Sequence, residues 1–190
     1  IEAVEQAVDR LQDRMKGVPF GVNLIHSPNE PDHEAATVDL FLRKGVRLIS
    51  ASAYLGLTLP LLRYRVKGLR RNEKGRIVCP NRLVAKVSRT EVAEKFLSPP
   101  PEKMLAKLLE QGRITPEEAH LARTVPVADS ITAEADSGGH TDNRPALALL
   151  PTLMALRDRM LETHDYGRPI HVGLGGGIAT PESTAAAFAM

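Results

Sequence analysis

The sequence predicts an α/β fold in which buried parallel strands alternate with helices. Short apolar runs rich in β-branched residues recur five times, and helical patterns separate them. The runs look apolar throughout, which is typical of strands covered on both faces of a parallel sheet. Small or polar residues follow all five runs, where a doubly wound sheet or a (β/α)8 barrel would bind its ligand. Because a doubly wound sheet concentrates its site at one switch point, we favour a (β/α)8 TIM barrel.

The composition indicates one globular domain. The 190 residues are 43% hydrophobic and 25% charged, which are ordinary values for a chain that buries a core. The formal net charge of +2 is too small to indicate a nucleic-acid partner. The single cysteine, Cys79, excludes an internal disulfide framework, so we expect a cytoplasmic location. No apolar run approaches the roughly 20 residues that span a bilayer, and we expect no membrane partner. Because the chain starts at Ile1 without Met, we expect a fragment.

The first part of the chain contains two predicted helix–strand units. Apolar residues at helical spacing predict an amphipathic helix over residues 1–16. The run FGVNLI at 20–25 is a predicted strand. A second helix is expected over residues 32–43 with Asp32 as its cap, followed by a strand at 46–50.

The next part is less regular. Residues 55–66 are predicted to be helical in part despite Pro60, and the turn residues 72–75 indicate a hairpin. A buried strand is expected at 83–87 and a short helix at 90–96. Residues 98–129 form a predicted helical insertion with helices at 102–111 and 116–123. Such a pair lies over a site or mediates association, and both alternatives stay open.

The stretch ITAEADSGGHTDNRP, at 131–145, organises the rest of the chain. It has the outline of a strand, a tight glycine-containing loop and a helix start. A long helix over 146–162 follows, interrupted or started late by Pro151, and then a strand at 170–174. Three glycines and a helix start at Thr180 come next. Such glycines can bare backbone N–H groups to a phosphate, although a tight packing turn gives the same pattern.

Several polar residues at predicted strand ends are candidates for chemistry. His140 has a reference pKa near neutrality and suits an acid or a donor to a carbonyl, or else a loop residue that caps backbone groups. Lys86 interrupts an apolar strand, where an ammonium group needs an anion, a carbonyl-rich ligand or solvent. The amide of Asn23 suits the edge of a flat heterocycle. A metal cluster of His26, His140, Asp136 and Asp142 lacks any ligand spacing, so we predict no metal.

A basic run occupies one segment that holds few acids. Its members are Arg63, Arg65, Lys67, Arg70, Arg71, Lys74 and Arg76. The run indicates either a solvated face or a surface for an acidic macromolecular partner.

These motifs together resemble a known family. The segments FGVNLI, SASAY, NRLVAKVSR, EADSGGHTDNRP and GLGGGIATPESTAAAF are similar to those of the PfaD-type trans-acting enoyl reductases. These enzymes serve polyunsaturated fatty-acid synthases and trans-acyltransferase polyketide synthases, and belong to the nitronate monooxygenase-like flavin barrels. The resemblance covers essentially all of the chain. The EADSGGHTDNRP block is specific, whereas the VNL and GGI pieces are shared more widely.

The resemblance implies an FMN-dependent oxidoreductase. It would take hydride from NADPH and reduce the 2,3-double bond of an enoyl thioester carried on acyl carrier protein, within a polyketide or fatty-acid synthase complex. Residues 1–190 would form the central part of one FMN-binding barrel, incomplete in this chain, with residues 98–129 inserted. The first barrel strand would precede Ile1, and the strand completing the phosphate site would follow Met190.

The resemblance also implies roles for individual residues. His140 would be catalytic, polarising the thioester carbonyl or donating the α-proton. The predicted cofactor-binding residues are Asn23, Lys86, Glu134, Asp136, Ser137, Gly138, Gly139, Gly175, Gly176 and Gly177. The predicted substrate or partner residues are Ser52, Asn143, Arg144, Arg65, Arg70 and Arg71. The three arginines, within the basic run, would dock the acidic carrier protein.

Three other functions stay open at this point. A nitronate monooxygenase would oxidise nitronates with oxygen and bleach poorly with NADPH. A non-catalytic barrel fragment that scaffolds a synthase would lack flavin. A metal hydrolase would be colourless and inhibited by chelators.

Overall fold

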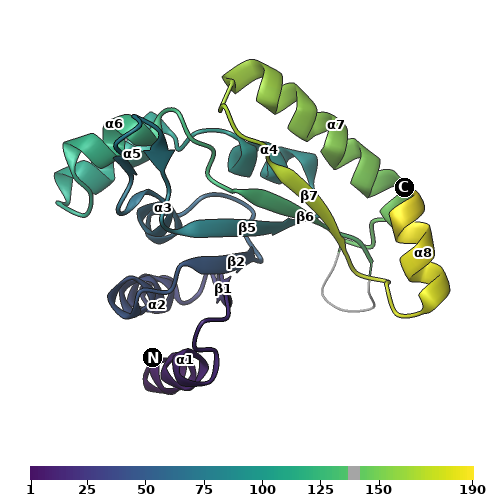
Figure 1. Cartoon of the computed structure of the whole chain (residues 1–190), viewed down its shortest axis with the longest axis horizontal. Coiled ribbons are helices and arrows are strands. Elements are labelled where there is room, and N and C mark those ends of the chain that lie inside the picture. The colour runs from purple at the N-terminus through teal and green to yellow at the C-terminus, as the bar shows by residue number, and fades with distance from the viewer. Residues whose placement is uncertain (137–141) are drawn as a thin grey trace.

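Five parallel strands form one sheet in the computed structural model, which describes residues 1–136 and 142–190. Their spatial order follows the chain: β1 (Val22–Ile25), β2 (Leu48–Ser52), β5 (Arg82–Val87), β6 (Ser130–Glu134) and β7 (His171–Gly175). The chain therefore winds across the sheet in one direction (Figure 1). A doubly wound sheet reverses its order at a switch point, and these five strands do not.

The predicted α/β class and the parallel sheet are confirmed, whereas the predicted eight-stranded barrel is not. In the described part of the chain β1 and β7 are the two edges of an open sheet. Helix α1 (Glu2–Arg14) precedes β1, and α8 (Pro181–Ala189) follows β7. The helices between the strands include α2 (Pro31–Lys44), α3 (Leu59–Val66), α4 (Thr90–Leu97) and α7 (Ala146–His164). Among the described helices, none combines the length and the apolarity needed to cross a membrane.

The two faces of the sheet differ in burial. Right-handed crossovers that advance in one direction place their helices on one face. On β2 and β5 the residues Ile49, Ala51 and Leu83 are fully buried, whereas their neighbours Ser50 and Lys86 are half-exposed. The expectation that the strands are apolar on both faces is therefore wrong. The alternation escapes notice in the sequence because serine and threonine, which are small, occupy several positions on the uncovered face.

Three helix boundaries differ from the prediction. Helix α2 has Glu30 rather than Asp32 as its N-cap, because the proline that follows Glu30 suits the first helical position. Helix α3 begins at Leu59, where the Thr58 hydroxyl accepts a hydrogen bond from a backbone N–H of the first turn. Helix α7 runs without interruption through Pro151, which is exposed in the second turn and removes only one backbone bond near the helix start.

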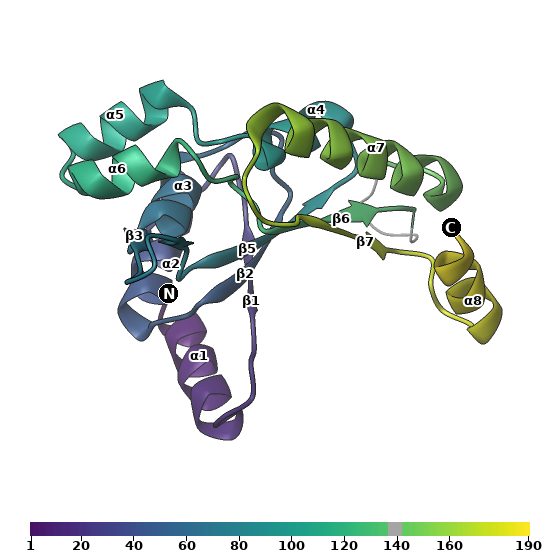
Figure 2. The ribbon, with the colours of Figure 1, turned by 45° about the horizontal axis from the view of Figure 1, so that its top comes forward.

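The predicted hairpin and the two helices of the insertion are present. Strands β3 (Arg70–Arg71) and β4 (Ile77–Val78) pair antiparallel, α6 (Pro116–Ala122) contacts β3, and α5 (Glu102–Glu110) packs on α6 (Figure 2). The Glu118 carboxylate closes a capping box with Thr115 and also accepts the backbone N–H of Gly68 at 2.7 Å. Since α4 ends and β6 begins at the amino edge of the sheet, the insertion lies there and not over the carboxyl ends of the strands.

Candidate active site

The carboxyl ends of the five strands bring most of the predicted residues of β1, β2, β5, β6 and β7 together. Because the strands are parallel, these ends meet at one edge of the sheet. The register pairs Asn23 with Ser50, Lys86 with Thr132 and Glu134 with Gly175, so these residues share the face that the helices leave uncovered. This face at this edge is the candidate site.

Polar side chains form two pairs across neighbouring strands. The Ser52 hydroxyl donates to Oδ1 of Asn23 at 2.8 Å, and Nζ of Lys86 lies 2.8 Å from Oε1 of Glu134. The lysine and glutamate side chains are 39% and 24% exposed. Because Ser52 occupies the carbonyl oxygen of Asn23, the amide NH2 of Asn23 is left to donate to a ligand. The ammonium group of Lys86 likewise keeps N–H donors beyond its bond to Glu134.

A glycine-rich turn follows β7. Gly176 and Gly177 have φ angles of 100° and 70°, and a Cβ on Gly177 would lie 3.3 Å from the carbonyl oxygen of Asp136. Within the described residues, no hydrogen bond is formed by the backbone N–H groups of Gly176, Gly177 and Ile178. The Thr180 side chain then caps α8. N–H groups that point to no protein acceptor, in front of a helix N-terminus, suit an anion.

A cavity of about 270 Å³ opens beside the Lys86–Glu134 pair. Asp142 lies on its wall and accepts hydrogen bonds from Nε and an NH2 group of Arg89, at 2.9 and 2.8 Å, and from the Ser88 hydroxyl. These bonds, chiefly those from Arg89, hold the pKa of the Asp142 carboxyl well below its usual range. The sequence prediction did not include Arg89, although a hydroxyl and a guanidinium directly after a strand were a usable signal.

Four predicted residues, Ser137, Gly138, Gly139 and His140, lie outside the described residues. The chain on either side of them is joined, since the backbone N–H of Asp136 donates to the carbonyl of Arg144 at 2.9 Å. Arg144 and Asp136 also border a second cavity of about 260 Å³, together with Gly176 and Gly177. Asn143 is exposed and has a φ of 53°.

The sequence prediction also missed a polar cluster behind the ends of β1 and β2. Nδ1 of His26 lies 2.8 Å from the buried carboxylate of Glu34, which also accepts the Thr58 hydroxyl. The Tyr54 ring stacks on His26 with centroids 5.1 Å apart, and burial raises the pKa of Tyr54. The cluster joins two strand-to-helix connections. Its members come from distant segments, and no local pattern connects them.

The prediction that Arg65 belongs to a docking surface is wrong. Its side chain is 0% exposed, and it donates to Asp129 Oδ2 at 2.7 Å and to the carbonyls of Asn81 and Pro126. Asp129 also accepts the backbone N–H of Leu83 at 2.8 Å. Arg65 is therefore part of the buried support for the amino ends of β5 and β6.

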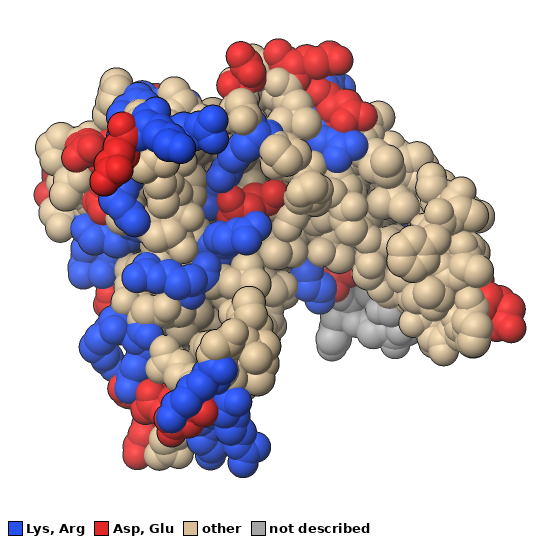
Figure 3. Space-filling model, viewed as in Figure 1, with Lys and Arg blue, Asp and Glu red and all other residues tan. Residues whose placement is uncertain are grey.

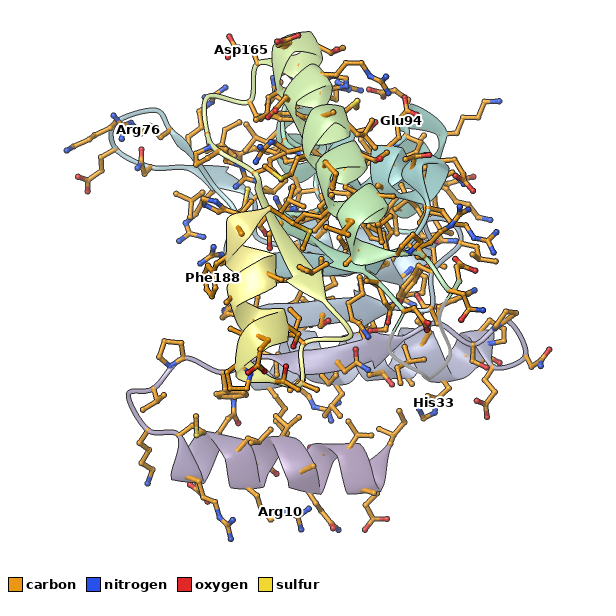
Figure 4. All side chains as sticks on the ribbon, turned by 90° about the vertical axis from the view of Figure 1, so that its right-hand side faces the viewer. Arg10, His33, Arg76, Glu94, Asp165 and Phe188 are labelled. Atoms are coloured by element: carbon orange, nitrogen blue, oxygen red, sulfur yellow. The ribbon has the colours of Figure 1, made fainter. Side chains whose placement is uncertain are left out.

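Arg70 and Arg71 are exposed, but they lie at the edge opposite to the candidate site. The hairpin that carries them leaves the end of α3 and leads to the start of β5. Figure 3 shows Lys and Arg gathered on the half of the molecule formed by α1, α2, α3 and this hairpin, and Figure 4 shows Arg76 projecting from it. The length of β5, at about 3.3 Å per residue, separates the hairpin from the strand ends by roughly 20 Å.

The fold is an α/β domain with one parallel sheet, and the candidate site lies at the carboxyl ends of the strands, where parallel α/β folds bind their ligands. No protein-family model matches the chain. The chain is 49% identical over 189 residues to the polyketide biosynthesis protein PksE of Bacillus subtilis, covering 99% of this chain and 25% of that protein. It is 50% identical over 189 residues to a polyunsaturated fatty acid synthase polypeptide of a Thraustochytrium species, covering 98% of this chain and 13% of that polypeptide.

A solved structure shares the same fold. It is the enoyl reductase domain of MlnA from the macrolactin biosynthesis cluster of Bacillus amyloliquefaciens, with a TM-score of 0.93 and 41% identity. The match covers 99% of this chain and 42% of that chain. The chain thus spans a quarter or less of the two curated relatives named above and under half of the solved domain. The resemblance to the PfaD-like enoyl reductases is confirmed.

Proposed function

We propose that this protein is an FMN-dependent enoyl reductase that uses NADPH and acts on 2-enoyl thioesters bound to acyl carrier protein. One observation carries the proposal. The pairs Asn23–Ser52 and Lys86–Glu134 lie on the uncovered face of the sheet. The edge strand β7 of the same sheet leads into a turn whose backbone N–H groups have no acceptor among the described residues. A flavin mononucleotide needs donors at its ring edge and an anion site at its phosphate.

The residues present fit this cofactor. The N–H groups of Gly176, Gly177 and Ile178 would hold the phosphate, since no described residue accepts them and they lie just before the N-terminus of α8. The amide of Asn23 and the ammonium group of Lys86 would donate to the carbonyl edge of the ring, and Glu134 would orient Lys86. When bound, the flavin supplies the hydride chemistry.

The chain's own residues would position the substrate and manage the proton. Reduction adds a hydride to the β-carbon of the enoyl thioester and a proton to the α-carbon. On the resemblance alone, we assign His140 to polarise the thioester carbonyl or to supply that proton. Ser52, Asn143 and Arg144 are assigned to the substrate side, and Asp142, held by Arg89, keeps the wall of the cavity in place.

The proposal extends to the whole protein. We propose that further strands complete an eight-stranded barrel, because the uncovered face carries the candidate site and needs walls on its other sides to exclude water. The partner would be a polyketide or fatty-acid synthase complex, in keeping with the names of PksE and the Thraustochytrium synthase. Because Arg65 is buried and Arg70 and Arg71 lie at the far edge, the carrier protein would approach at the strand ends.

Visible absorbance under anaerobic conditions tests the function. The purified protein should show a flavin spectrum that bleaches with NADPH and returns when a crotonyl thioester is added, with one butyryl product formed per flavin reoxidised. Flavin that bleaches but is reoxidised only by oxygen would contradict enoyl reduction. A colourless protein that fails to take up FMN would contradict the cofactor assignment.

A further inference from the structure

The cavity beside Lys86 and Glu134 is also lined by residues that are not assigned to the flavin. These residues come from the connections after β2, β5 and β6 and from the start of α4. They include Tyr54, Leu55, Ser88, Arg89, Val92 and Asp142. Three of them offer apolar or aromatic surface and three offer hydrogen-bonding groups, so the lining suits a ligand that is itself partly apolar and partly polar.

The charged groups of the lining are paired with one another. Lys86 is bonded to Glu134 at 2.8 Å, and Arg89 holds Asp142 through two bonds of 2.8 and 2.9 Å. Two cations therefore face two anions, and the described lining carries no net charge. A phosphate or carboxylate entering here would meet the carboxylates of Glu134 and Asp142 as well as the two cations, so it would gain no net attraction from the lining. The lining thus favours a neutral ligand over an anionic one.

The shape of the cavity restricts the ligand further. Its volume of about 270 Å³ is smaller than most sites for drug-sized ligands, which measure about 300–1,000 Å³. Leu55 is the exposed member of the lining, with 64% of its surface exposed, and Lys95 donates to the Leu55 backbone carbonyl at 3.1 Å. A slender chain fits a cavity of this size, whereas a dinucleotide is both too large and too charged.

We propose that this cavity binds the pantetheine part of the thioester substrate, a neutral chain of amides and methylenes. The proposal rests on the proposed function, and it deepens that function by giving the substrate a path. The thioester would lie at the Lys86 end, and the chain would leave over Leu55 towards the carrier protein. Tyr54 and Val92 would contact its methyl and methylene groups, and the polar atoms around Ser88 would face its amides.

Calorimetric titration of the oxidised protein with butyryl-pantetheine, a saturated analogue that cannot be reduced, tests this subsite. Leu55→Glu should weaken binding about tenfold, because it removes an apolar contact and adds a charge. The affinity of Leu55→Glu for butyryl-N-acetylcysteamine, which is too short to reach Leu55, should differ less than twofold from that of the wild type. The matched control is Leu109→Glu, which replaces a leucine on α5 that is 39% exposed. This control should bind both ligands with the affinity of the wild type. Equal affinity of the wild type and Leu55→Glu for butyryl-pantetheine would overturn the proposal.

A second variant tests the charge argument. Asp142→Asn leaves Arg89 without its carboxylate, so the cavity should then bind inorganic phosphate in competition with butyryl-pantetheine, whereas the wild type should not. Competition by phosphate in the wild type would overturn the assignment of a neutral ligand. The two proposals fail separately. If Leu55→Glu weakens the binding of butyryl-pantetheine but the wild type reduces no enoyl thioester, only the proposed function is contradicted. If the wild type reduces enoyl thioesters and Leu55→Glu binds butyryl-pantetheine equally well, only the subsite is contradicted.

Discussion

The ammonium nitrogen of Lys86 lies 2.8 Å from Oε1 of Glu134, and this pair joins β5 to β6 at their carboxyl ends. A second ion pair, Arg65 with Asp129, supports the same two strands at their amino ends. The difference between them is burial. Arg65 is fully enclosed and bonded to two backbone carbonyls, whereas Lys86 keeps 39% of its side chain exposed and faces a cavity. The buried pair contributes to stability, and the exposed pair is available to a ligand.

Replacing Lys86 tests the exposed pair. In Lys86→Met the donor to the flavin ring is lost, so we expect at least tenfold weaker FMN binding, measured by titration of the apoprotein. The free energy of unfolding of the apoprotein should change by less than about 1 kcal/mol, because the side chain is partly solvated. Glu134→Gln should weaken FMN binding less, since it leaves the ammonium group in place. Unchanged FMN affinity in Lys86→Met would contradict the assignment.

Replacing Asp129 tests the buried pair. Asp129→Asn leaves the Arg65 guanidinium enclosed without its counter-ion, so we expect a loss of about 3–5 kcal/mol in the free energy of unfolding. Arg70→Met, which removes an exposed arginine of the hairpin, should cost less than about 0.5 kcal/mol. Urea unfolding followed by circular dichroism measures both. Similar small losses in the two variants would show that Arg65 is not a structural residue.

The far-edge position of the basic hairpin gives a prediction about the carrier protein. The double variant Arg70→Glu/Arg71→Glu should leave kcat/KM within about twofold of the wild type, for both carrier-bound and pantetheine-bound crotonyl thioesters, because the hairpin does not border the cavity. A rise in KM for the carrier-bound substrate alone would contradict this prediction and restore the hairpin as the docking surface.

Local patterns predicted the strands and the residues at their ends, but they did not reveal long-range partners. Asn23 and Lys86 were recognisable because each places a polar group inside an apolar run. Arg65 looked like a member of an exposed basic run, because its partner Asp129 is 64 positions away and becomes a neighbour only when β5 and β6 pair. The Glu34 cluster was hidden for the same reason, since its members come from helix α2 and from the two connections that follow β1 and β2.

The phosphate turn gives a further prediction. Both Gly177 and Gly167 have positive φ angles, 70° and 62°, so alanine at either should cost about 1–2 kcal/mol in the free energy of unfolding. A Cβ on Gly167 would have no neighbour within 4 Å, whereas one on Gly177 would lie 3.3 Å from the Asp136 carbonyl oxygen. Only Gly177→Ala should therefore reduce FMN affinity, by tenfold or more. Equal FMN affinity in the two variants would argue against a phosphate site at this turn.

The Arg89–Asp142 pair predicts a specific dependence of stability on pH. Hydrogen bonds from Arg89 lower the pKa of Asp142 in the folded protein below its unfolded value of about 3.9. A lowered folded-state pKa stabilises the protein above the unfolded pKa, and this contribution is lost as the pH falls towards the folded pKa. The wild type should therefore unfold with a larger free energy than Asp142→Asn at neutral pH, and the difference should shrink below about pH 4. Other carboxylates with lowered pKa values, such as Glu5 and Glu102, are present in both proteins and cancel in the comparison. Urea unfolding of both proteins from pH 7 to pH 3 measures the difference, and a gap that stays constant to pH 3 would contradict the role of Arg89.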